Sequence, residues 1–332
     1  MNLALVGHGS IGSKFKESIL RDFVDIKNLY IIETNKKVIK DLITKGLNCY
    51  ESLEELEDNK ITISYGIVAN WGPDHLKTAN KLIDLGCKKL IIEKPLSSRK
   101  DELQEFIKRC SKEGIFVTVH HKWNFTNIVE IIKNIQSNYN LGNPIGIRLI
   151  GGAVCFSTNG THAFGLSCKL LDSHPKTITA DLEIDYINPR GKDLAYIGGM
   201  ASYKMQNNTF IHASFTNSNS QSLTIECVYR NSSIQFSSDN SIKLFKRDEE
   251  EIKKYENKIT RYGSLKLIKE VKFESTPTVK QILSNLIYDE YPKVSLKEAE
   301  IPVLMVIGAL ESHLKKKKID YDNIEDTGVL IS

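Results

Sequence analysis

Met1-Asn-Leu-Ala-Leu-Val6 is a short apolar run, and Gly7-His-Gly-Ser-Ile-Gly12 follows it directly. The next segment carries apolar side chains at helical spacing, at Phe15, Ile19 and Leu20. Strand, glycine turn and helix in this order are the context in which Gly-x-Gly-x-x-Gly indicates a dinucleotide-binding fold. The first glycine permits a tight turn, the second lets a pyrophosphate approach the backbone, and the third lets the helix pack on the strand. This stretch therefore predicts the start of a Rossmann sheet, with a phosphate site at the helix N-terminus.

An acidic residue follows the second predicted strand. Asn28–Ile32 is largely apolar, and Glu33 comes directly after it, about 20 residues past the glycine turn, as the fingerprint requires. A carboxylate there can accept hydrogen bonds from both ribose hydroxyls and would repel a 2′-phosphate, which favours NAD over NADP. Lys36 and Lys37 follow closely and could neutralise such a phosphate, so NADP stays open. The cofactor-binding residues predicted from this region are Gly7, Gly9, Ser10, Ile11, Gly12 and Glu33.

Composition is typical of a globular protein with two domains. The 332 residues suffice for two hydrophobic cores, and 41% are hydrophobic and 26% charged. The 45 basic and 41 acidic residues are interspersed, so no nucleic-acid surface is indicated. No apolar run reaches membrane-spanning length, and Met1 opens directly into the first strand, so we expect a cytoplasmic protein without a signal peptide. Six scattered cysteines without a Cys-x-x-Cys pair predict reduced thiols and no metal site.

Strands and helices alternate through the first third of the sequence. The predicted elements are strands within 61–69, at 89–92 and at 116–120, and helices at 75–85 and 101–110. Ser97 or Ser98 is the expected cap of the second of these helices. Such alternation implies a parallel sheet covered on both faces, with ligands at the carboxyl ends of its strands. Residues 1–122 are therefore predicted to form a doubly wound Rossmann domain.

Strands dominate from about residue 123 onward, after a predicted helix at 128–135. The predicted strands cover 145–150, 177–186, 199–206, 210–216, 222–229 and 233–236. Their alternating polarity predicts an open, largely antiparallel sheet with one helical face. Residues 239–262 are charged and indicate a strand plus a solvated segment, and amphipathic helices follow at 281–288 and 302–314. We predict a C-terminal α/β domain over 123–332 for substrate binding and oligomerisation, with final helices able to pack back on the first domain.

Two residues are candidates for catalysis. Lys94 lies in Glu93-Lys94-Pro95, directly after the strand at 89–92, where strand ends surround the nicotinamide of a dinucleotide fold. A lysine there can hydrogen-bond a substrate oxygen and place positive charge beside a developing alkoxide. A surface lysine before a helix-starting proline is the alternative. His162 lies after a glycine turn at the mouth of a predicted helix, where an imidazole can transfer a proton near neutral pH; a structural histidine is the alternative.

These features together resemble the Gfo/Idh/MocA family, which includes glucose–fructose oxidoreductase and inositol dehydrogenase. The matching segments, in family order, are Gly7–Gly12, Ile67–His75, Glu93–Pro95, Gly151–Gly152, Asn159–His162 and Glu311–Ser312. Glu-Lys-Pro is the most specific of these motifs, and the resemblance spans nearly the whole chain. It implies hydride transfer between a nicotinamide cofactor and a sugar, cyclitol or nucleotide-sugar alcohol or ketone. It also implies a homo-oligomer, a dimer or tetramer, formed through the open C-terminal sheet.

The resemblance further implies roles for individual residues. Lys94 would polarise the reacting oxygen, and His162 would be the proton acid/base. The residues that would line the cofactor are Asn70, Trp71, His75, Glu93 and Lys122. Those that would contact the substrate are Trp123, Thr158 and Asn159. His121, beside Lys122 in the sequence, is expected to pack rather than to act as a base.

The sequence also departs from the family pattern. Thr158 stands where many members carry an Asp four residues before the histidine, and Gly165 where many carry an Asp three residues after it. The first change removes a carboxylate that would orient His162 or the substrate. These departures motivate one alternative to the dehydrogenase, an NAD-sensing regulatory protein without turnover. A reductase of a non-sugar carbonyl or imine is a second alternative, because specificity lies in loop geometry that the sequence does not give. A loop-rich stretch holds further candidates for binding hydroxyls or a phosphate, namely Tyr186, Arg190, Lys192 and Tyr196.

Overall fold

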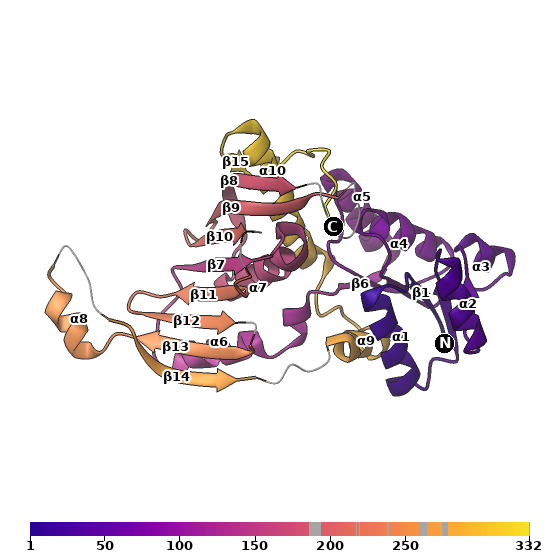
Figure 1. Ribbon diagram of the computed structural model, residues 1–332, viewed down its shortest axis with the longest axis horizontal. Helices are drawn as coiled ribbons and strands as arrows, with labels where there is room; N and C mark the ends of the chain where they lie inside the picture. The colour runs from indigo at the N-terminus through magenta and orange to yellow at the C-terminus, as the bar shows by residue number, and fades with distance from the viewer. Residues whose placement is uncertain are drawn as a thin grey trace.

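The computed structural model describes residues 1–185, 194–216, 218, 220–237, 239–258, 264–273 and 278–331. Figure 1 shows two sheets side by side, each with its own helices. Three of the four loop candidates above, Tyr186, Arg190 and Lys192, lie outside the described residues. The predicted α/β class, with a parallel and a largely antiparallel sheet, is confirmed.

The first sheet is parallel and has six strands. They are β1 (Asn2–Val6), β2 (Asn28–Ile32), β3 (Asn48–Tyr50), β4 (Tyr65–Val68), β5 (Lys89–Ile92) and β6 (Phe116–Val119). The helices between them are α1 (Ser10–Asp22), α2 (Lys36–Thr44), α3 (Glu54–Asp58), α4 (His75–Asp84) and α5 (Lys100–Glu113). The strand order β3-β2-β1-β4-β5-β6 reverses direction between β1 and β4. Ligands of doubly wound sheets bind at this switch point, outside the carboxyl ends of the strands.

The second sheet has nine strands in the order β14-β13-β12-β11-β7-β10-β9-β8-β15. The strands are β7 (Gly146–Gly152), β8 (Pro175–Asp185), β9 (Tyr196–Met205), β10 (Phe210–Thr216), β11 (Thr224–Val228), β12 (Ser232–Ser237), β13 (Ser241–Lys246), β14 (Lys266–Lys272) and β15 (Ile319–Asp320). Neighbouring strands are antiparallel except β7 and β10, which pair in parallel. The sheet is thus mixed, with one parallel pair at its centre.

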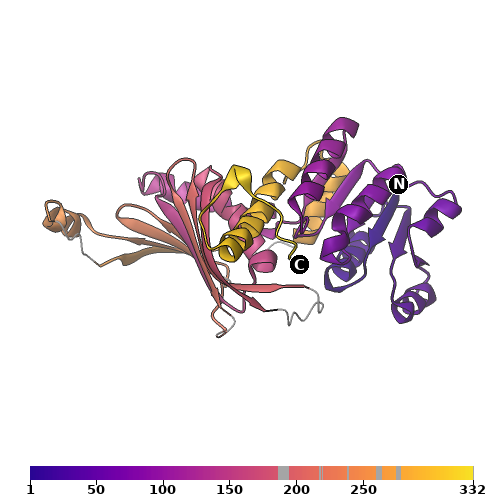
Figure 2. The ribbon, with the colours of Figure 1, turned by 90° about the horizontal axis from the view of Figure 1, so that it is seen from above.

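Helices cover one face of the second sheet, as Figure 2 shows from above. They include α7 (Thr161–Leu171), which contacts β7, and α10 (Leu296–Lys315), which contacts β8. On strands β7 and β9 the side chains of Ile150 and Met200 are 45% and 60% exposed. Both pair in register with Ser214 of β10, so they lie on either side of the same residue. This sheet therefore has apolar side chains at the surface near its centre.

The C-terminal part contains further helical elements. They include η2 (Lys122–Phe125), α6 (Ile128–Asn138), η3 (Phe156–Gly160) and α8 (Glu249–Tyr255). Residues 239–262 are predicted to be a strand plus a solvated segment, and their described part holds β13 and α8. Helix α8 is capped by the Asp248 side chain, which accepts the Glu251 amide. Figure 1 shows α8 protruding at the end of the sheet farthest from the first domain.

The end of the chain returns to the first sheet. Helix α9 (Thr278–Tyr288) packs on α1 and β5, and α10 contacts α5 and β6. The expectation that Ser97 or Ser98 caps α5 is wrong, because the cap is Arg99 and its side chain makes no capping bond. Ser98 instead donates its hydroxyl to the carbonyl of Ile331 and accepts the amide of the same residue. The division at residue 122 stays a prediction, since later segments pack on both parts.

Candidate active site

A cleft of about 1280 Å³ lies where the switch point of the parallel sheet meets η2, η3 and α9. Most of the predicted site residues line it: Gly7, Gly9, Ser10, Ile11, Glu33, Asn70, Trp71, His75, Glu93, Lys94, Lys122, Trp123, Asn159 and His162. Two predicted residues, Gly12 and Thr158, do not line it. The structure thus brings residues from widely separated parts of the sequence to one cavity.

The glycine turn has the steric properties that a pyrophosphate site requires. Gly7 has a φ of +90°, and a Cβ there would come within 2.6 Å of the Ala69 carbonyl oxygen. A Cβ on Gly12 would overlap the Gly7 carbonyl, whereas one on Gly9 would meet nothing within 4 Å. Helix α1 begins at Ser10, without a side-chain cap and without an acid in its first turn. Open space beside an uncapped helix N-terminus fits a cofactor phosphate.

Glu33 is fixed at the end of β2 by two backbone amides. Its Oε2 accepts the amide of His8 and its Oε1 accepts the amide of Asn35, both at 2.9 Å. Each carboxylate oxygen has a second lone pair for a further donor. The carboxylate therefore braces the glycine turn and fits the ribose hydroxyls of a dinucleotide, which is the role that the sequence predicts.

Glu93 forms a buried pair with His120, which follows the neighbouring strand β6. His120 Nδ1 lies 2.5 Å from Glu93 Oε1, and His120 Nε2 lies 3.2 Å from the Thr278 hydroxyl at the start of α9. Burial raises the pKa of the Glu93 carboxyl, but His120, Lys94 and His75 together lower it further, so that the net pKa lies below its usual value. The carboxylate is therefore ionised at neutral pH beside Lys94.

The loop after β4 supplies the residues predicted over the cofactor. Nδ1 of His75 lies 2.8 Å from the Pro95 carbonyl and Nε2 lies 3.3 Å from the Asn70 carbonyl, and burial lowers the pKa of this imidazole. Asn70 donates from Nδ2 to the Thr78 hydroxyl at 2.8 Å. Its Oδ1 is buried without a hydrogen-bond partner among the described residues. Because unpaired buried acceptors are costly, this oxygen fits a donor from a bound ligand.

His162 faces the cleft from the first turn of α7. It is 7% exposed, and its ring lies 5.6 Å from the His121 ring and 6.1 Å from that of Trp123. Burial first, then the charges of Lys94, His121 and Lys122, place the pKa of His162 well below its usual value. His162 is therefore neutral at neutral pH and can accept a proton. Lys122 lies 4.7 Å from the Trp123 ring centroid, and burial lowers the pKa of its ammonium.

The positions where the family carries acids have other contacts here. The Thr158 hydroxyl donates to the Cys155 carbonyl of its own turn at 3.4 Å. A Cβ on Gly165 would lie 3.9 Å from His121 Nδ1. Both ring nitrogens of His121 and Nδ1 of His162 are buried without a partner in the described structure. The histidines thus lack the carboxylates that would orient them.

Several cleft residues received no role from the sequence: His120, Thr126, Asn240, Phe273, Thr278, Val279 and Lys280. His120 was predicted as the last residue of the strand at 116–120, but β6 ends at Val119, so His120 directly follows the strand, as Glu93 and Lys94 follow β5. Thr278 and Lys280 reach the cleft because α9 packs back on α1. No local pattern in the sequence gives that contact.

No group of three or more His, Cys, Asp or Glu side chains among the described residues could hold a metal ion. No helix within those residues is long and apolar enough to cross a membrane.

Comparisons with known proteins agree on the fold. No curated protein matches the chain. Among solved structures, myo-inositol 2-dehydrogenase from Lactobacillus plantarum is 13% identical, with 96% of this chain and 99% of that chain covered and a TM-score of 0.73. GenD2 from gentamicin A biosynthesis, solved with NAD, is 15% identical over 96% of each chain, with a TM-score of 0.72. The super-repressor mutant of Gal80p from Saccharomyces cerevisiae is 14% identical over 98% and 99% of the chains, with a TM-score of 0.71.

One family model matches the sequence directly. It describes an oxidoreductase family with an NAD-binding Rossmann fold and covers residues 1–121, which end just after the strand that His120 follows. The glycine turn, Glu33 and the Glu93 segment described above all fall within this match. The resemblance predicted from the sequence is thus confirmed over residues 1–121, which match the model of this oxidoreductase family with an NAD-binding Rossmann fold.

Proposed function

We propose that the protein is an NAD-dependent oxidoreductase that interconverts an alcohol and a ketone on a sugar, cyclitol or nucleotide sugar. The observation that carries this proposal is the position of Lys94 and His162 on one cleft with the glycine turn. The first is an oxygen-polarising cation and the second a neutral imidazole, which together are the two groups that alcohol oxidation needs. NADP stays open, because Lys36 and Lys37 follow Glu33.

The residues of the cleft have different roles in the proposed reaction. When bound, the nicotinamide cofactor supplies or takes up the hydride. Lys94 orients the substrate oxygen and stabilises negative charge on it as the proton leaves. His162, neutral in the resting protein, accepts that proton in the oxidative direction and returns it in the reductive one. The Glu93–His120 pair fixes the strand ends from which Lys94 projects, because its hydrogen bond joins the segments after β5 and β6.

The test is a screen of NADH and NADPH absorbance at 340 nm against sugars, cyclitols and nucleotide sugars. We expect a substrate-dependent signal in the wild type and a loss of roughly 100-fold or more in kcat for Lys94→Ala, with NAD affinity nearly unchanged. Lys88→Ala, an exposed lysine close to β5, is the matched control and should behave as the wild type. A signal that survives Lys94→Ala would place the chemistry elsewhere.

One specific observation favours a second candidate. The missing carboxylates at Thr158 and Gly165 leave the histidines without orienting partners, and the fold is shared with a regulatory protein, Gal80p. An NAD-sensing regulator would bind NAD tightly, turn over no substrate, and bind a protein partner only with NAD present. A reductase of a non-sugar carbonyl or imine would use the same site, and an enlarged substrate panel separates it from the sugar enzyme.

The quaternary structure proposed from the sequence is a homo-oligomer through the C-terminal sheet. It is supported by the exposed Ile150 and Met200 side chains on either side of Ser214. Apolar side chains grouped at a sheet surface are typical of interfaces. The cytoplasmic location stays a prediction of the sequence.

A further inference from the structure

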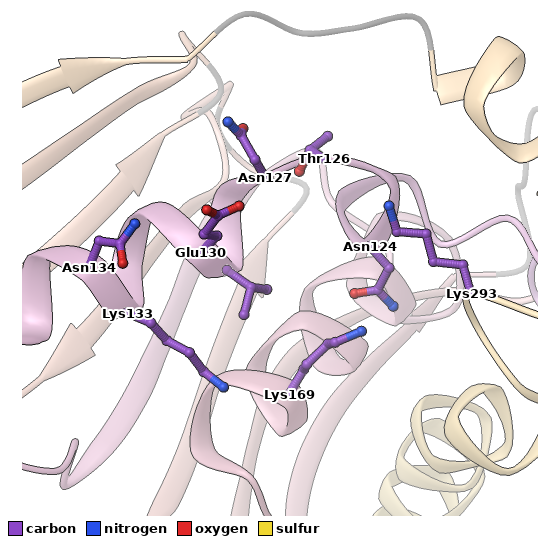
Figure 3. A pocket seen from close by; sticks show the side chains of 9 residues that line it. Asn124, Thr126, Asn127, Glu130, Lys133, Asn134, Lys169 and Lys293 are labelled. Atoms are coloured by element: carbon purple, nitrogen blue, oxygen red, sulfur yellow. The ribbon is translucent and has the colours of Figure 1, made fainter.

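A second hollow of about 450 Å³ lies beside the catalytic cleft (Figure 3). It is lined by Asn124, Thr126, Asn127, Val129, Glu130, Lys133, Asn134, Lys169 and Lys293. Its walls come from η2, α6, α7 and the segment before α10. Thr126 lines both cavities, and its hydroxyl donates to the Trp123 carbonyl at 2.7 Å. The hollow therefore adjoins the substrate end of the cleft.

The lining of the hollow is basic. Its lining includes three lysines, Lys133, Lys169 and Lys293, and one carboxylate, Glu130. Lys169 lies 3.9 Å from Glu298, a long contact between partly exposed groups that neutralises little of its charge. For Lys133 and Lys293, the described residues provide no carboxylate within ion-pair distance. The excess of ammonium groups favours a ligand with negative charge.

Asn124 gives an independent sign of a ligand. It is only 9% exposed and lines the hollow, yet its side-chain Oδ1 is buried without a hydrogen-bond partner among the described residues. Figure 3 shows its amide between the side chains of Lys169 and Lys293. An unsatisfied amide oxygen beside ammonium groups fits a ligand that has a hydroxyl next to its anionic group.

Helix α7 relates the hollow to the reaction site. His162 and Lys169 are seven residues apart on this helix, so they lie on the same face, roughly 10 Å apart along its axis. The hollow is therefore placed for the far end of a substrate whose reacting carbon lies at Lys94 and His162. A sugar ring with a phosphate at the opposite end is of this size class, and lysines bind phosphate as point charges.

We propose that this hollow binds the phosphate group of a phosphorylated sugar or nucleotide-sugar substrate, with Lys169 and Lys293 as its cations and Asn124 as the acceptor of a neighbouring hydroxyl. The inference rests on the proposed function and names the substrate class of that site. It excludes simple unphosphorylated cyclitols as the preferred substrates.

The first experiment measures binding without turnover. Pyrophosphate is titrated calorimetrically into protein saturated with NAD, so that the glycine turn is already occupied. We expect one site in the wild type, weakened at least about 10-fold in Lys169→Gln/Lys293→Gln. Lys108→Gln, an exposed lysine on α5, is the control and should bind as the wild type. Equal pyrophosphate affinity in the double variant and the wild type, or no binding to the wild type, would overturn the phosphate site.

The second experiment compares each sugar with its phosphorylated form in the absorbance screen. The double variant should raise KM for the phosphorylated form at least about 10-fold with little change in kcat, and leave unphosphorylated sugars unaffected. Equal kinetics with and without the phosphate would reject the inference and keep the dehydrogenase. Pyrophosphate binding that depends on the two lysines, with no turnover of any sugar, would keep the phosphate site and reject the dehydrogenase.

Discussion

The cofactor end and the substrate end of the cleft differ in whether their functional groups have the partners that their roles require. At the cofactor end, the glycine turn, the α1 N-terminus and the braced Glu33 carboxylate are all in place. At the substrate end, Lys94 and His162 are present, but His162 Nδ1 has no partner within the described residues. The first end depends on backbone shape, and the second depends on side-chain partners. A dinucleotide site can therefore be kept intact while the chemistry beside it changes.

The largest expected effect tests whether the substrate end of the cleft catalyses the reaction. His162→Ala should lower kcat by roughly 100- to 10,000-fold, the usual contribution of a positioned acid/base group. Thr158→Ala should change kcat by less than about 3-fold, because the Thr158 hydroxyl donates to its own turn and a turn bond is worth only about 1 kcal/mol. Steady-state kinetics with the substrate found in the screen measures both. A Thr158 effect as large as that of His162 would show that this residue acts on the substrate.

At the cofactor end, Gly9→Ala should weaken NAD binding without lowering stability, whereas Gly12→Ala should lower stability even without NAD. A Cβ on Gly9 enters open space, so the free protein keeps its stability while the cofactor phosphate loses its approach and NAD binds about 10- to 100-fold more weakly. A Cβ on Gly12 overlaps the Gly7 carbonyl, so that variant should lose about 3 kcal/mol of stability even without NAD. Chemical denaturation and NAD titration separate the two. Unchanged NAD affinity in Gly9→Ala would mean that phosphate does not approach this backbone.

The buried histidines predict a pH dependence of stability. Burial, followed by the charges of Lys94 and His120, lowers the pKa of His121 to about 3. The unfolded chain binds a proton near pH 6.5 and the folded chain does not, so stability falls as pH drops from 6.5 toward 3, by up to about 1.4 kcal/mol per pH unit. His121→Phe should make this slope shallower in urea unfolding between pH 6.5 and 4. An unchanged slope would show that His121 protonates without cost.

The smallest expected effect is at Gly165, the second position where many family members carry an Asp. Gly165 lies inside α7, and a Cβ there would make ordinary contacts of 3.9 Å with His121 and Pro302. Gly165→Ala should therefore raise the free energy of unfolding by about 0.5–1 kcal/mol, the usual gain inside a helix. Thermal unfolding measures it. A destabilised variant would mean that the space beside His121 is needed, for instance by a water molecule.

The cofactor end could be predicted from the sequence because its signal is local. Strand, glycine turn, helix and Glu33 lie within 33 residues, and Lys94 follows a strand whose carboxyl end must face the cofactor. The short strand β3 and the edge strand β14 had no distinct prediction, because three residues and an exposed charged run show no clear apolar alternation.

The hollow and the contacts of α9 could not be predicted for a different reason. Asn124, Lys169 and Lys293 come from three separate segments, and Thr278 meets His120 across 158 residues of sequence. Only the packing of α9 on α1 and of α7 beside η2 brings them together. The contact of Thr158 could not be predicted either. The sequence predicts that Thr158 contacts the substrate, whereas in the turn of η3 its hydroxyl donates to the Cys155 carbonyl.

The pair of hydrogen bonds between Ser98 and Ile331 has a consequence for motion. Lys100, close to Ser98, also donates its backbone amide to Asp326 and its ammonium to the Ile324 carbonyl. The last residues are thereby fastened to the start of α5, while α9 is fastened to α1. A hinge that swings the two sheets apart would have to break the hydrogen bonds that hold the last residues to Ser98 and Lys100. Cofactor exchange is therefore expected to proceed by rearrangement of side chains and loops at the mouth of the cleft, with the two sheets moving as one body.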